Sequence, residues 1–504
     1  MRHIVQQAQE AWEPVACVAQ ILIVQRAIIV KVMYAKVVEG LVSQFVDYKI
    51  YFMNQKYLDY KKKYENKKVV IMGLGLHGGG IGSARFFSEL GSNVVVTDLK
   101  TEEELNSSIE KLKDCKNIEY VLGGHREEDF KNSDLIIKNP GVRDTSTFLK
   151  LAIENNIEID TDIGIFFSIC ENEIIGITGT KGKSTTTKLI TELLETKYNV
   201  VAGGNYRVSV LDIQKELKKD DVIILELSSW QLEGLEKHKL SPHISVLTNL
   251  FEDHLNTYDN SMQNYANAKN IIFRFQKEND FSIINSDNEN TFKYFNFDNL
   301  KSNKIYFSKK NIENNLLKNF KLFGNHNLEN LAAAISVAKI MNIEDKNIEK
   351  VLENFKAPEG RQELVREING IKFINDTTAT SPSGAIQALN SVKGKIILMA
   401  GGVDKNLDYK EFGELIIEKF NKKELKNLVL FKNSFTTATD KILNIIDKKV
   451  EYEFADSMED AISKAYKNAA NGDSILLSPG GASFGMFQHE FDRGEQFNNI
   501  VKSL

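Results

Sequence analysis

Apolar and polar positions along the 504-residue chain form three successive stretches in which short apolar runs alternate with helical periodicity. Such alternation is typical of strands that join a parallel sheet through helical crossovers. The apolar runs of the first stretch lie near residues 69–73, 94–98, 118–122 and 134–138. Those of the second lie near 173–178, 199–202, 222–226 and 244–248, and those of the third near 371–375, 395–400, 427–431 and 474–478. The pattern therefore predicts an α/β protein with three consecutive domains.

The breaks between these stretches predict the domain boundaries. We expect an N-terminal extension over 1–66 and domains over 67–171, 172–357 and 358–504. Residues 15–46 are rich in Val, Ile and Ala, but charged residues and Gln interrupt them, so no run approaches the roughly 20 apolar residues of a membrane span. No clear signal peptide is present. The extension is interpreted either as an added helix or as a start codon placed too early, with translation beginning near Met53.

Composition narrows the class of protein without naming a function. The chain is 42% hydrophobic and 26% charged, as in ordinary globular proteins, and its net charge of -5 gives no electrostatic case for a nucleic-acid partner. Three cysteines without metal-like spacing favour a reducing cytoplasm. We expect a cytoplasmic monomer that is not inserted in a membrane.

The segment GITGTKGKSTTTKLI (176–190) carries the strongest chemical signal. An apolar strand enters a glycine-rich turn, and Lys183 and Ser184 then open a helix. Backbone N–H groups of such a turn bind phosphate oxygens, the lysine neutralises the β- and γ-phosphates, and the hydroxyl binds Mg²⁺. Ile177 stands where the general motif has its first glycine. The segment predicts a nucleotide-binding site.

Two later strands end in side chains that suit a metal near a triphosphate. Glu226 follows the strand within LELSSWQLE (225–233), and Asp253 and His254 follow the strand before TNLFEDHLNTY (248–258). The ends of parallel strands meet at one edge of a sheet, where α/β proteins place their sites. A carboxylate and an imidazole there suggest Mg²⁺ ligation, whereas without the phosphate loop a solvated loop would be the better interpretation.

The first stretch contains a second glycine motif. Gly73, Gly75 and Gly78 have the spacing G-x-G-x-x-G after a strand, and Asp98 follows about 20 residues later. Taken alone, this fingerprint predicts an NAD-dependent dehydrogenase. That alternative leaves the phosphate loop and the third domain unexplained.

Six segments follow one another along the chain: T-G-T-x-G-K-S-T, LELSSWQLE, TNLFEDHLNTY, YANAKNI (265–271), GNHNLEN (324–330) and PEGRQE (358–363). The Mur ligases have similar segments in the same order, and the folylpolyglutamate synthetases are related to these ligases. The chain resembles the Mur ligase family from about residue 67 to its end. The resemblance implies a Rossmann-like UDP-binding domain, a central P-loop ATPase-like domain and a C-terminal Rossmann-like domain. It also implies an ATP-dependent amide ligase of peptidoglycan precursor synthesis.

The resemblance implies roles for individual residues. In the ligases of this family, the lysine at the position of Lys269 is carbamylated by CO₂. Four residues would serve catalysis: Lys183, Glu226, His254 and Lys269. ATP would contact Gly179, Thr180, Lys181, Gly182, Lys183, Ser184, Thr185, Asn327, Asn330, Arg361 and Asp376. Two Mg²⁺ ions would be held by Ser184, Glu226, His254 and carbamylated Lys269. The other substrates would contact Gly75, Asp98, Asn139, Pro140, Gly141, Asn205, Thr380, Lys405, Ser483 and Phe484.

Three segments resemble the D-glutamate-adding branch of the family: INDTTATSP (374–382), AGGVDKNLDY (400–409) and LLSPGGASFGMFQHEFDRGEQF (476–497). The implied substrates are UDP-N-acetylmuramoyl-L-alanine and D-glutamate, which would be joined through an acyl phosphate. The chain departs from family patterns at Asn139, Asn256 and Thr378. Because Thr378 stands where some D-glutamate ligases have a lysine near the substrate, carboxylate recognition would lean more on Lys405. L-Glutamate or another amino acid as acceptor, and a nucleotide sensor without catalysis, stay open as alternatives.

Overall fold

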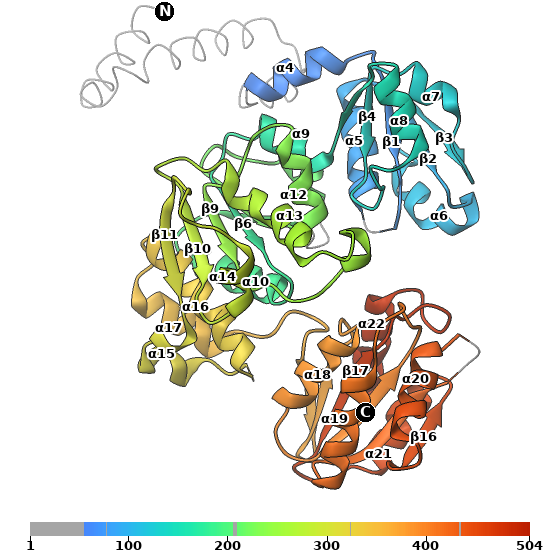
Figure 1. Ribbon diagram of the computed structural model, residues 1–504, viewed down its shortest axis with the longest axis vertical. Helices are drawn as coiled ribbons and strands as arrows, with labels where there is room; N and C mark the ends of the chain where they lie inside the picture. Colours follow the sequence, from blue (N-terminus) through green and yellow to red (C-terminus); the bar gives the residue numbers. More distant parts are fainter. Residues whose placement is uncertain (1–54, 77, 205–208, 323, 433–434) are drawn as a thin grey trace, which may run out of the picture. The chain divides into compact units, whose positions relative to one another are not determined.

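The computed structural model describes residues 55–504 except residues 77, 205–208, 323 and 433–434 (Figure 1). The predicted N-terminal extension and the predicted substrate contact Asn205 therefore lie largely or wholly outside the described residues. The chain divides into a unit of residues 1–59 and a unit of residues 60–504. Helix α4 (Gln55–Tyr64) is the first element described.

The larger unit contains three sheets, one for each predicted domain (Figure 1). The first sheet is wholly parallel in the order β3-β2-β1-β4-β5. Its strands are β1 (Lys68–Met72), β2 (Asn93–Asp98), β3 (Ile118–Leu122), β4 (Leu135–Lys138) and β5 (Glu158–Asp160). Its helices are α5 (Gly79–Leu90), α6 (Glu102–Ile109), η2 (Glu110–Leu112), α7 (Glu127–Lys131), α8 (Thr147–Glu154) and α9 (Asp162–Ile169).

The second sheet is also parallel, in the order β11-β10-β9-β6-β8-β7. Its strands are β6 (Ile174–Thr178), β7 (Val200–Gly204), β8 (Val222–Glu226), β9 (Ile244–Leu247), β10 (Phe281–Asn285) and β11 (Asn303–Phe307). Its main helices are α10 (Lys183–Leu194), α11 (Val210–Gln214), α12 (Ser229–Glu236), α13 (Met262–Arg274), α16 (Asn325–Ile340) and α17 (Asp345–Asn354). Shorter turns of helix are η3 (Leu255–Thr257), α14 (Glu289–Tyr294), η4 (Lys309–Asn311) and α15 (Asn314–Asn319).

The third sheet has the order β12-β13-β17-β14-β15-β16, in which only β12 runs antiparallel to its neighbour. Its strands are β12 (Glu363–Ile368), β13 (Ile371–Asn375), β14 (Ile396–Gly401), β15 (Leu425–Phe431), β16 (Tyr452–Ala455) and β17 (Ser474–Gly480). Its helices are α18 (Pro382–Ser391), α19 (Lys410–Asn421), α20 (Thr437–Ile446), α21 (Met458–Lys467) and α22 (Glu490–Ser503). The prediction of three consecutive α/β domains is confirmed.

The central strands are apolar along their whole length because helices cover both faces of each sheet. In β14, Ile396 and Leu398 pack into one core of the third sheet, while Ile397 and Met399 pack into the other. A strand buried on both faces reads as a continuous apolar run, which is why the sequence located these strands well. Within the described residues, none of the helices has the length and apolar character that crossing a membrane requires.

The strand orders fix where the functional loops converge. In the second sheet, β6 lies between β8 and β9, so the loops after these three strands meet at one edge. In the third sheet, β17 lies between β13 and β14 in the same way. Such points, where the chain changes direction across a sheet, are the usual ligand sites of open α/β sheets. The phosphate loop, Glu226 and His254 lie at the first of these edges, and Asp376, Lys405 and Ser483 lie at the second.

Candidate functional site

The phosphate loop joins β6 to α10 and has backbone angles that suit glycine. Gly179 and Gly182 have φ values of +145° and +83°, which side chains with a Cβ rarely adopt. A Cβ on Gly182 would lie 2.2 Å from Oδ1 of Asn330. Lys183 folds back over the loop and its Nζ donates to the carbonyl oxygens of Gly179 and Thr180 at 2.9 and 3.1 Å. The loop is thus shaped around a lysine ammonium at the N-terminus of a helix, an arrangement that binds phosphate.

Ser184 and Glu226 meet at the start of α10. The Ser184 hydroxyl donates to Oε2 of Glu226 at 2.6 Å, and the Glu226 side chain is buried at the end of β8. Parallel pairing of Ile177 with Glu226 brings the end of β8 beside the phosphate loop. Two hard oxygen ligands therefore lie next to the position that a triphosphate would occupy.

The loop after β9 is hydrogen-bonded to the phosphate loop. The amide N–H of Lys181 donates to Oδ1 of Asn249 at 2.8 Å, and Nδ2 of Asn249 donates back to the Lys181 carbonyl at 3.0 Å. The Lys181 ammonium pairs with Asp253 at 3.1 Å. Lys181, predicted to contact ATP, therefore binds a carboxylate of the neighbouring loop in this structure.

His254 follows this loop in a conformation that is uncommon outside glycine. Its φ is +54°, and such outliers gather at functional sites. The indole of Trp230 packs against the imidazole with ring centroids 4.8 Å apart. About half of the His254 side chain stays exposed. Trp230 thus limits the orientations of a side chain that the sequence assigns to a metal.

Lys269 is a buried amine. The residue is 2% exposed on α13, its Nζ donates to the Gly179 carbonyl at 3.1 Å, and it lies 4.5 Å from the centroid of the Tyr265 ring. Among the described residues, no carboxylate lies within ion-pair distance of it. Burial, and then the neighbouring Lys183, hold the pKa of Lys269 well below its ordinary value. The Lys269 ammonium therefore gives up its proton, and becomes a nucleophilic amine, more readily than an exposed lysine does.

The two predicted adenine-side asparagines lie on α16 behind the phosphate loop. Nδ2 of Asn330 donates to Oδ1 of Asn327 at 3.1 Å, and the Thr186 hydroxyl donates to Oδ1 of Asn330 at 3.3 Å. Both asparagines are buried, and both line the same cavity as Lys183. Asn330 thus holds the start of α10 in place as well as facing the cavity.

A cavity of about 380 Å³ gathers most of the predicted ATP and amino-acid residues. Its walls come from the phosphate loop, from the loop carrying Asp253 and His254, and from the start of the third domain. The predicted residues that line it are Thr180, Lys181, Gly182, Lys183, Ser184, Thr185, Glu226, His254, Asn327, Asn330, Arg361, Asp376, Thr380 and Lys405. Asp253, which the sequence suggested beside His254 as a metal ligand, lines it too, as do residues to which the sequence gave no role: Asn256, His326, Gln362, Thr378 and Gln387.

Asp376 is buried at the end of β13. Its Oδ2 accepts from the Ser478 hydroxyl at 2.8 Å, and its Oδ1 accepts from the Gln362 amide at 3.1 Å. Burial raises the pKa of the Asp376 carboxyl to about 7, against the opposing effect of these hydrogen bonds and of Arg361. The carboxyl can therefore donate or accept a proton near neutral pH.

The predicted amino-acid contacts gather at the edge of the third sheet. Nζ of Lys405 donates to the Thr380 hydroxyl at 3.0 Å. The Ser483 hydroxyl is buried and has no hydrogen-bond partner among the described residues. The Phe484 ring, by contrast, is 57% exposed. A cation and an unused buried hydroxyl at one sheet edge suit a carboxylate ligand.

Hydrogen bonds to the side chains of Asp98 and Asn139 stabilise the glycine turn of the first domain. Oδ2 of Asp98 accepts from the amides of Leu74 and Gly75 at 2.8 and 3.1 Å. Nδ2 of Asn139 donates to the Gly73 carbonyl at 3.1 Å. Asp98 and Asn139, predicted as substrate contacts, therefore shape the turn that a substrate would meet.

The closest approach of α5 to the turn falls at Gly80. A Cβ on Gly80 would lie 2.4 Å from the carbonyl oxygens of Gly73 and Leu74. In the G-x-G-x-x-G fingerprint this packing role belongs to the third glycine, which the sequence placed at Gly78. Because three glycines follow one another at 78–80, the close packing of helix against strand falls at Gly80, two residues after Gly78.

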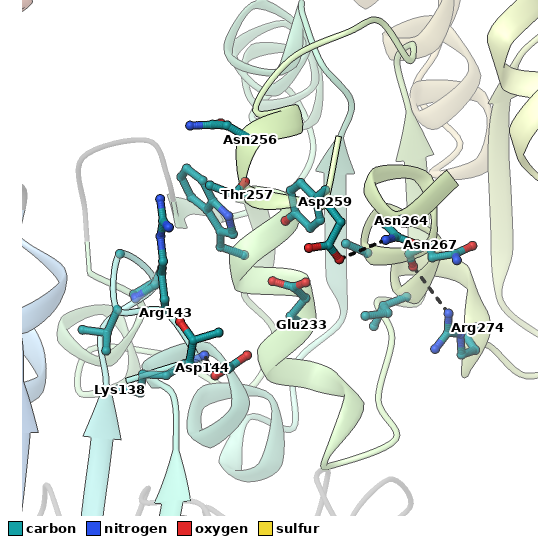
Figure 2. A pocket seen from close by; sticks show the side chains of 18 residues that line it. Lys138, Arg143, Asp144, Glu233, Asn256, Thr257, Asp259, Asn264, Asn267 and Arg274 are labelled. Atoms are coloured by element: carbon teal, nitrogen blue, oxygen red, sulfur yellow. Dashed lines mark hydrogen bonds and ion pairs between the residues drawn. The ribbon is translucent and has the colours of Figure 1, made fainter. Parts of the chain in front are cut away.

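A second cavity, of about 760 Å³, lies between the loop after β4 and helices α12 and α13 (Figure 2). Pro140 and Gly141 line it. Figure 2 shows Glu233 of α12 between the loop that carries Arg143 and the start of α13. Burial raises the pKa of the Glu233 carboxyl, against the attraction of Lys138. The predicted contacts Pro140 and Gly141 thus open onto a cavity of mixed charge.

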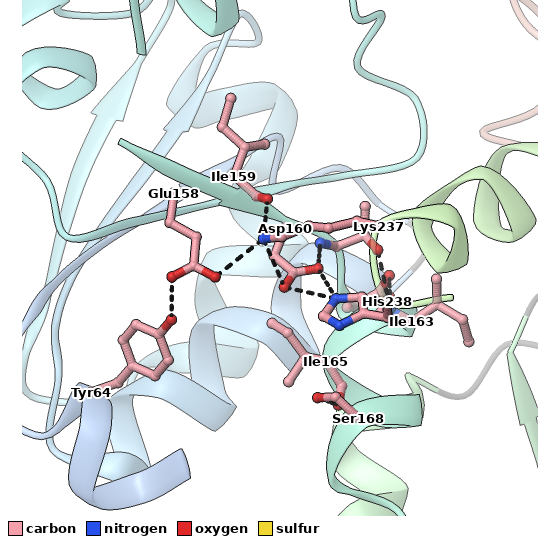
Figure 3. Close-up of polar contacts among 12 residues, drawn as sticks. Tyr64, Glu158, Ile159, Asp160, Ile163, Ile165, Ser168, Lys237 and His238 are labelled. Atoms are coloured by element: carbon pink, nitrogen blue, oxygen red, sulfur yellow. Dashed lines mark hydrogen bonds and ion pairs between the residues drawn. The ribbon is translucent and has the colours of Figure 1, made fainter. Parts of the chain in front are cut away.

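A polar network joins α4, β5 and the end of α12 (Figure 3). Oε2 of Glu158 accepts from the Tyr64 hydroxyl at 3.0 Å, and Oε1 accepts from Lys237 at 3.1 Å. His238 Nε2 lies 2.9 and 3.0 Å from the two oxygens of Asp160. Burial opposes ionisation of Glu158, but hydrogen bonds from Lys63, Lys237 and Tyr64 outweigh it and hold the pKa at about 2. The network ties the last strand of the first sheet to a helix that follows the Glu226 strand.

Family models match all three predicted domains. The Mur ligase MurD-like N-terminal domain matches residues 67–161, the Mur ligase middle domain matches 177–338, and the Mur ligase glutamate ligase domain matches 360–481. Each range lies inside one predicted domain.

Relatives with similar sequences span nearly the whole chain. UDP-N-acetylmuramoylalanine--D-glutamate ligase of Roseiflexus sp. is 35% identical over 87% of this chain and 99% of its own length. The proteins of the same name from Borreliella burgdorferi and Acetivibrio thermocellus are 38% and 36% identical, over 87% and 90% of this chain and 98% and 100% of their own lengths.

Solved structures agree on the fold. UDP-N-acetylmuramate-alanine ligase of Thermotoga maritima is 19% identical with a TM-score of 0.56, over 87% of this chain and 99% of its own. A MurF structure from Acinetobacter baumannii is 14% identical with a TM-score of 0.54, over 90% of this chain and 99% of its own.

The chain belongs to the Mur ligase family, and its sequence relatives place it in the D-glutamate-adding branch. The family uses ATP, which agrees with the phosphate loop. The family resemblance predicted from the sequence is therefore confirmed. The dehydrogenase alternative, which rested on the glycine turn alone, is wrong.

Proposed function

We propose that this chain joins the amino group of D-glutamate to the alanine carboxylate of UDP-N-acetylmuramoyl-L-alanine at the expense of ATP, in the synthesis of peptidoglycan precursors. The sequence relatives named for this reaction support the proposal. One structural observation carries it. The phosphate-loop residues Lys183 and Ser184 and the amino-acid residues Thr380 and Lys405 line a single cavity.

The chemistry needs this convergence. A carboxylate oxygen of the alanine attacks the γ-phosphorus of ATP, and ADP leaves, which gives an acyl phosphate. The free amine of glutamate then attacks the acyl carbon. The tetrahedral intermediate expels phosphate and loses a proton from nitrogen, so that an amide remains. Because direct amide formation in water is unfavourable, cleavage of ATP supplies the driving force.

The protein contributes positioning and neutralisation of charge. Lys183 would leave its carbonyl partners for the β- and γ-phosphates, and Arg361 lines the cavity where it can reach the same anions. Thr180, Gly182 and Thr185, which line the cavity, would present the loop backbone and the first helical turn to the phosphates. Gly179 begins the same loop. Asp376 would serve the ribose side of ATP, with a pKa that lets it accept a hydrogen bond or donate one.

Magnesium fits the donor set at the start of α10. Mg²⁺ prefers oxygen ligands, keeps several waters, and needs only one or two protein groups beside the phosphates. Ser184 and Glu226 supply such oxygens 2.6 Å apart, and His254 lines the same cavity. No cluster of three or more His, Cys, Asp or Glu side chains that could hold a metal occurs among the described residues, so the proposed ions depend on the nucleotide for further ligands. The metal would offset charge on the transferring phosphoryl group.

Lys269 fits the proposed carbamate. Its neutral amine can add to the carbon of CO₂ and release one proton, which turns a cation into an anion. Nothing else in its surroundings requires a buried lysine, since its contacts are the Gly179 carbonyl and the Tyr265 ring. A carbamate here would be a further oxygen ligand for magnesium.

The proposed UDP substrate would lie against the glycine turn of the first domain. Gly75 has a φ of +60° and open space where a Cβ would be, so its surface is free for a ligand. Gly141, whose amide donates to Oδ1 of Asn139 at 3.3 Å, continues this surface into the second cavity with Pro140. Asp98 would act mainly by fixing the turn, because three backbone amides already occupy its oxygens.

The test is phosphate release from ATP by the full-length protein with UDP-N-acetylmuramoyl-L-alanine and one of D-glutamate, L-glutamate, D-aspartate or L-lysine. Release with D-glutamate alone is expected. Release with L-glutamate instead would retain the ligase chemistry and reverse the stereochemical assignment. Folded, ATP-binding protein that stays silent with all four amino acids would contradict the proposal and favour a nucleotide sensor.

A further inference from the structure

Arg493 is the largest fully buried side chain of the described residues and carries a charge without a partner of opposite sign. It lies in the first turn of α22 and is 0% exposed. Among residues 55–504, apart from the gaps given above, no carboxylate lies within ion-pair distance of its guanidinium. Buried charges are normally paired, and a helix N-terminus disfavours a cation. Burial of an unpaired cation at this position is unfavourable, and the role of Arg493 therefore lies in the hydrogen bonds that it makes.

The guanidinium joins two loops at the edge of the third sheet. Its Nε donates to the Thr377 hydroxyl at 3.0 Å and one Nη donates to the Thr377 carbonyl at 2.8 Å. The other Nη donates to the Gly481 carbonyl at 3.2 Å. Thr377 follows β13 and Gly481 follows β17, so one side chain fixes the relative position of two neighbouring loops.

Those loops carry the proposed amino-acid contacts. Thr380 lies three residues after Thr377, and Ser483 lies two residues after Gly481. Reciprocal backbone hydrogen bonds of 2.8 and 2.9 Å between Val403 and Ala482 add the loop of Lys405 to the same assembly. All three loops therefore depend on the side chain at position 493 for their packing.

Two cations, Arg493 and Lys405, lie at this sheet edge, and both feel the attraction of Glu490. Burial lowers the pKa of Arg493 to about 10, against the attraction of Glu490 and Asp376, so the guanidinium stays protonated at neutral pH. Lys405 supplies a second cation on the same sheet edge. The buried Ser483 hydroxyl has no hydrogen-bond partner among the described residues. The site thus combines two cations with an unused donor, which is the environment that a dicarboxylate neutralises.

We propose that Arg493 is a positioning residue of the glutamate site, which fixes the loops of Thr380 and Ser483 and provides a permanent positive potential for the carboxylates of the incoming amino acid. This inference rests on the proposed function. The side chain itself is enclosed and touches no substrate. Its effect therefore falls on glutamate binding and not on the nucleotide.

Two substitutions separate the effect of the Arg493 charge from the effect of its hydrogen bonds. Arg493→Lys keeps the charge and loses the fork of three hydrogen bonds, whereas Arg493→Gln keeps donors and loses the charge. We expect the KM for D-glutamate to rise about tenfold or more in Arg493→Gln and less in Arg493→Lys. The KM for ATP should stay within about twofold in both. Inhibition by glutarate, a dicarboxylate without the amine, should weaken in the same order.

Arg366→Met is the matched control. Arg366 donates to the carbonyls of Val501 and Lys502 at 3.4 and 2.9 Å, at the opposite end of the same helix. The Arg366→Met substitution should lower the melting temperature without changing the KM for glutamate.

The wild-type rate with D-glutamate, measured in the same assay, tests the proposed function first. Its absence would overturn both that function and this inference. With the wild type active, unchanged KM values in both Arg493 variants would overturn the inference alone. So would a fall in kcat and melting temperature without a selective change for glutamate.

Discussion

The hydroxyl of Ser184 and the carboxylate of Glu226 lie 2.6 Å apart, although 42 residues separate them in the chain. One belongs to the first turn of α10 and the other ends β8. Because β6 and β8 pair in parallel, the phosphate loop and the end of β8 are held together by the sheet itself. The magnesium ligands proposed here are therefore preorganised before nucleotide binds.

Ser184→Ala and Glu226→Gln should each raise the Mg²⁺ concentration needed for half-maximal turnover, because each removes one oxygen ligand. The two effects should not add. A double-mutant cycle should give a coupling of about 1 to 2 kcal/mol, as expected for groups in contact. Thr191→Ala, which removes a hydroxyl two turns further along α10, provides a control. Additive effects of the two changes would contradict a shared metal site.

Gly182→Ala should disrupt nucleotide binding. The new Cβ would combine a left-handed backbone with a 2.2 Å approach to Asn330, and we expect a loss of roughly 1 to 3 kcal/mol in stability together with weaker ATP binding. Gly123→Ala is the matched control, because Gly123 has a φ of +76° and nothing within 4 Å of the Cβ position. Isothermal titration with ATP and thermal unfolding measure the two effects. Equal behaviour of both variants would show that backbone strain, and not contact with Asn330, dominates.

Lys269 should react with CO₂. A ¹³C NMR spectrum of protein equilibrated with ¹³C-bicarbonate should show a carbamate resonance, because burial lowers the pKa of the Lys269 amine well below its ordinary value. Lys269→Ala should lack the resonance, and Lys293→Ala, which removes an exposed lysine of α14, should keep it. A wild-type spectrum without the resonance, in the presence of Mg²⁺ and ADP, argues against the modification.

Asp376 should make stability depend on pH in a defined window. Its carboxyl has an ordinary pKa of 3.8 when the chain is unfolded and about 7 when folded. The folded state therefore binds more protons between these values, and stability falls as pH rises from about 4 through 7. Asp376→Asn removes this dependence. The melting temperature of the variant should therefore rise relative to that of the wild type as the pH increases over the same range. Exposed Asp456→Asn should follow the wild type, and parallel curves for all three proteins would contradict the raised pKa.

The sequence could place three of the proposed ATP-site residues together because each of them follows an apolar strand. Lys183, Glu226 and His254 could be placed together by the rule that parallel strands end at one edge of a sheet. The edge strands β12 and β16 were missed, since half-exposed segments such as ELVREI lack a continuous apolar run.

Other contacts depend on tertiary packing that no local pattern reveals. Arg493 stands among charged residues in HEFDRGEQF and reads as a surface arginine, yet it is enclosed. Asp98 was predicted as a substrate contact, but its Oδ2 accepts from two amides of the glycine turn and its Oδ1 accepts from the Lys100 amide. Asn249 resembles any loop asparagine, and only the proximity of β9 to β6 gives it the phosphate loop as a partner.

The reciprocal hydrogen bonds between Val403 and Ala482 bear on how this kind of enzyme can change its amino acid. They join the loops of Lys405 and Ser483 on the third sheet, which contributes no phosphate loop. Thr380 lies in a third loop of the same sheet, after β13. Selectivity and energy supply are thus encoded in separate, exchangeable segments of the gene. A recombination event that replaced only the codons after residue 376 would exchange Thr380, Lys405 and Ser483, while the proposed ATP contacts Lys183, Arg361 and Asp376 stayed in place.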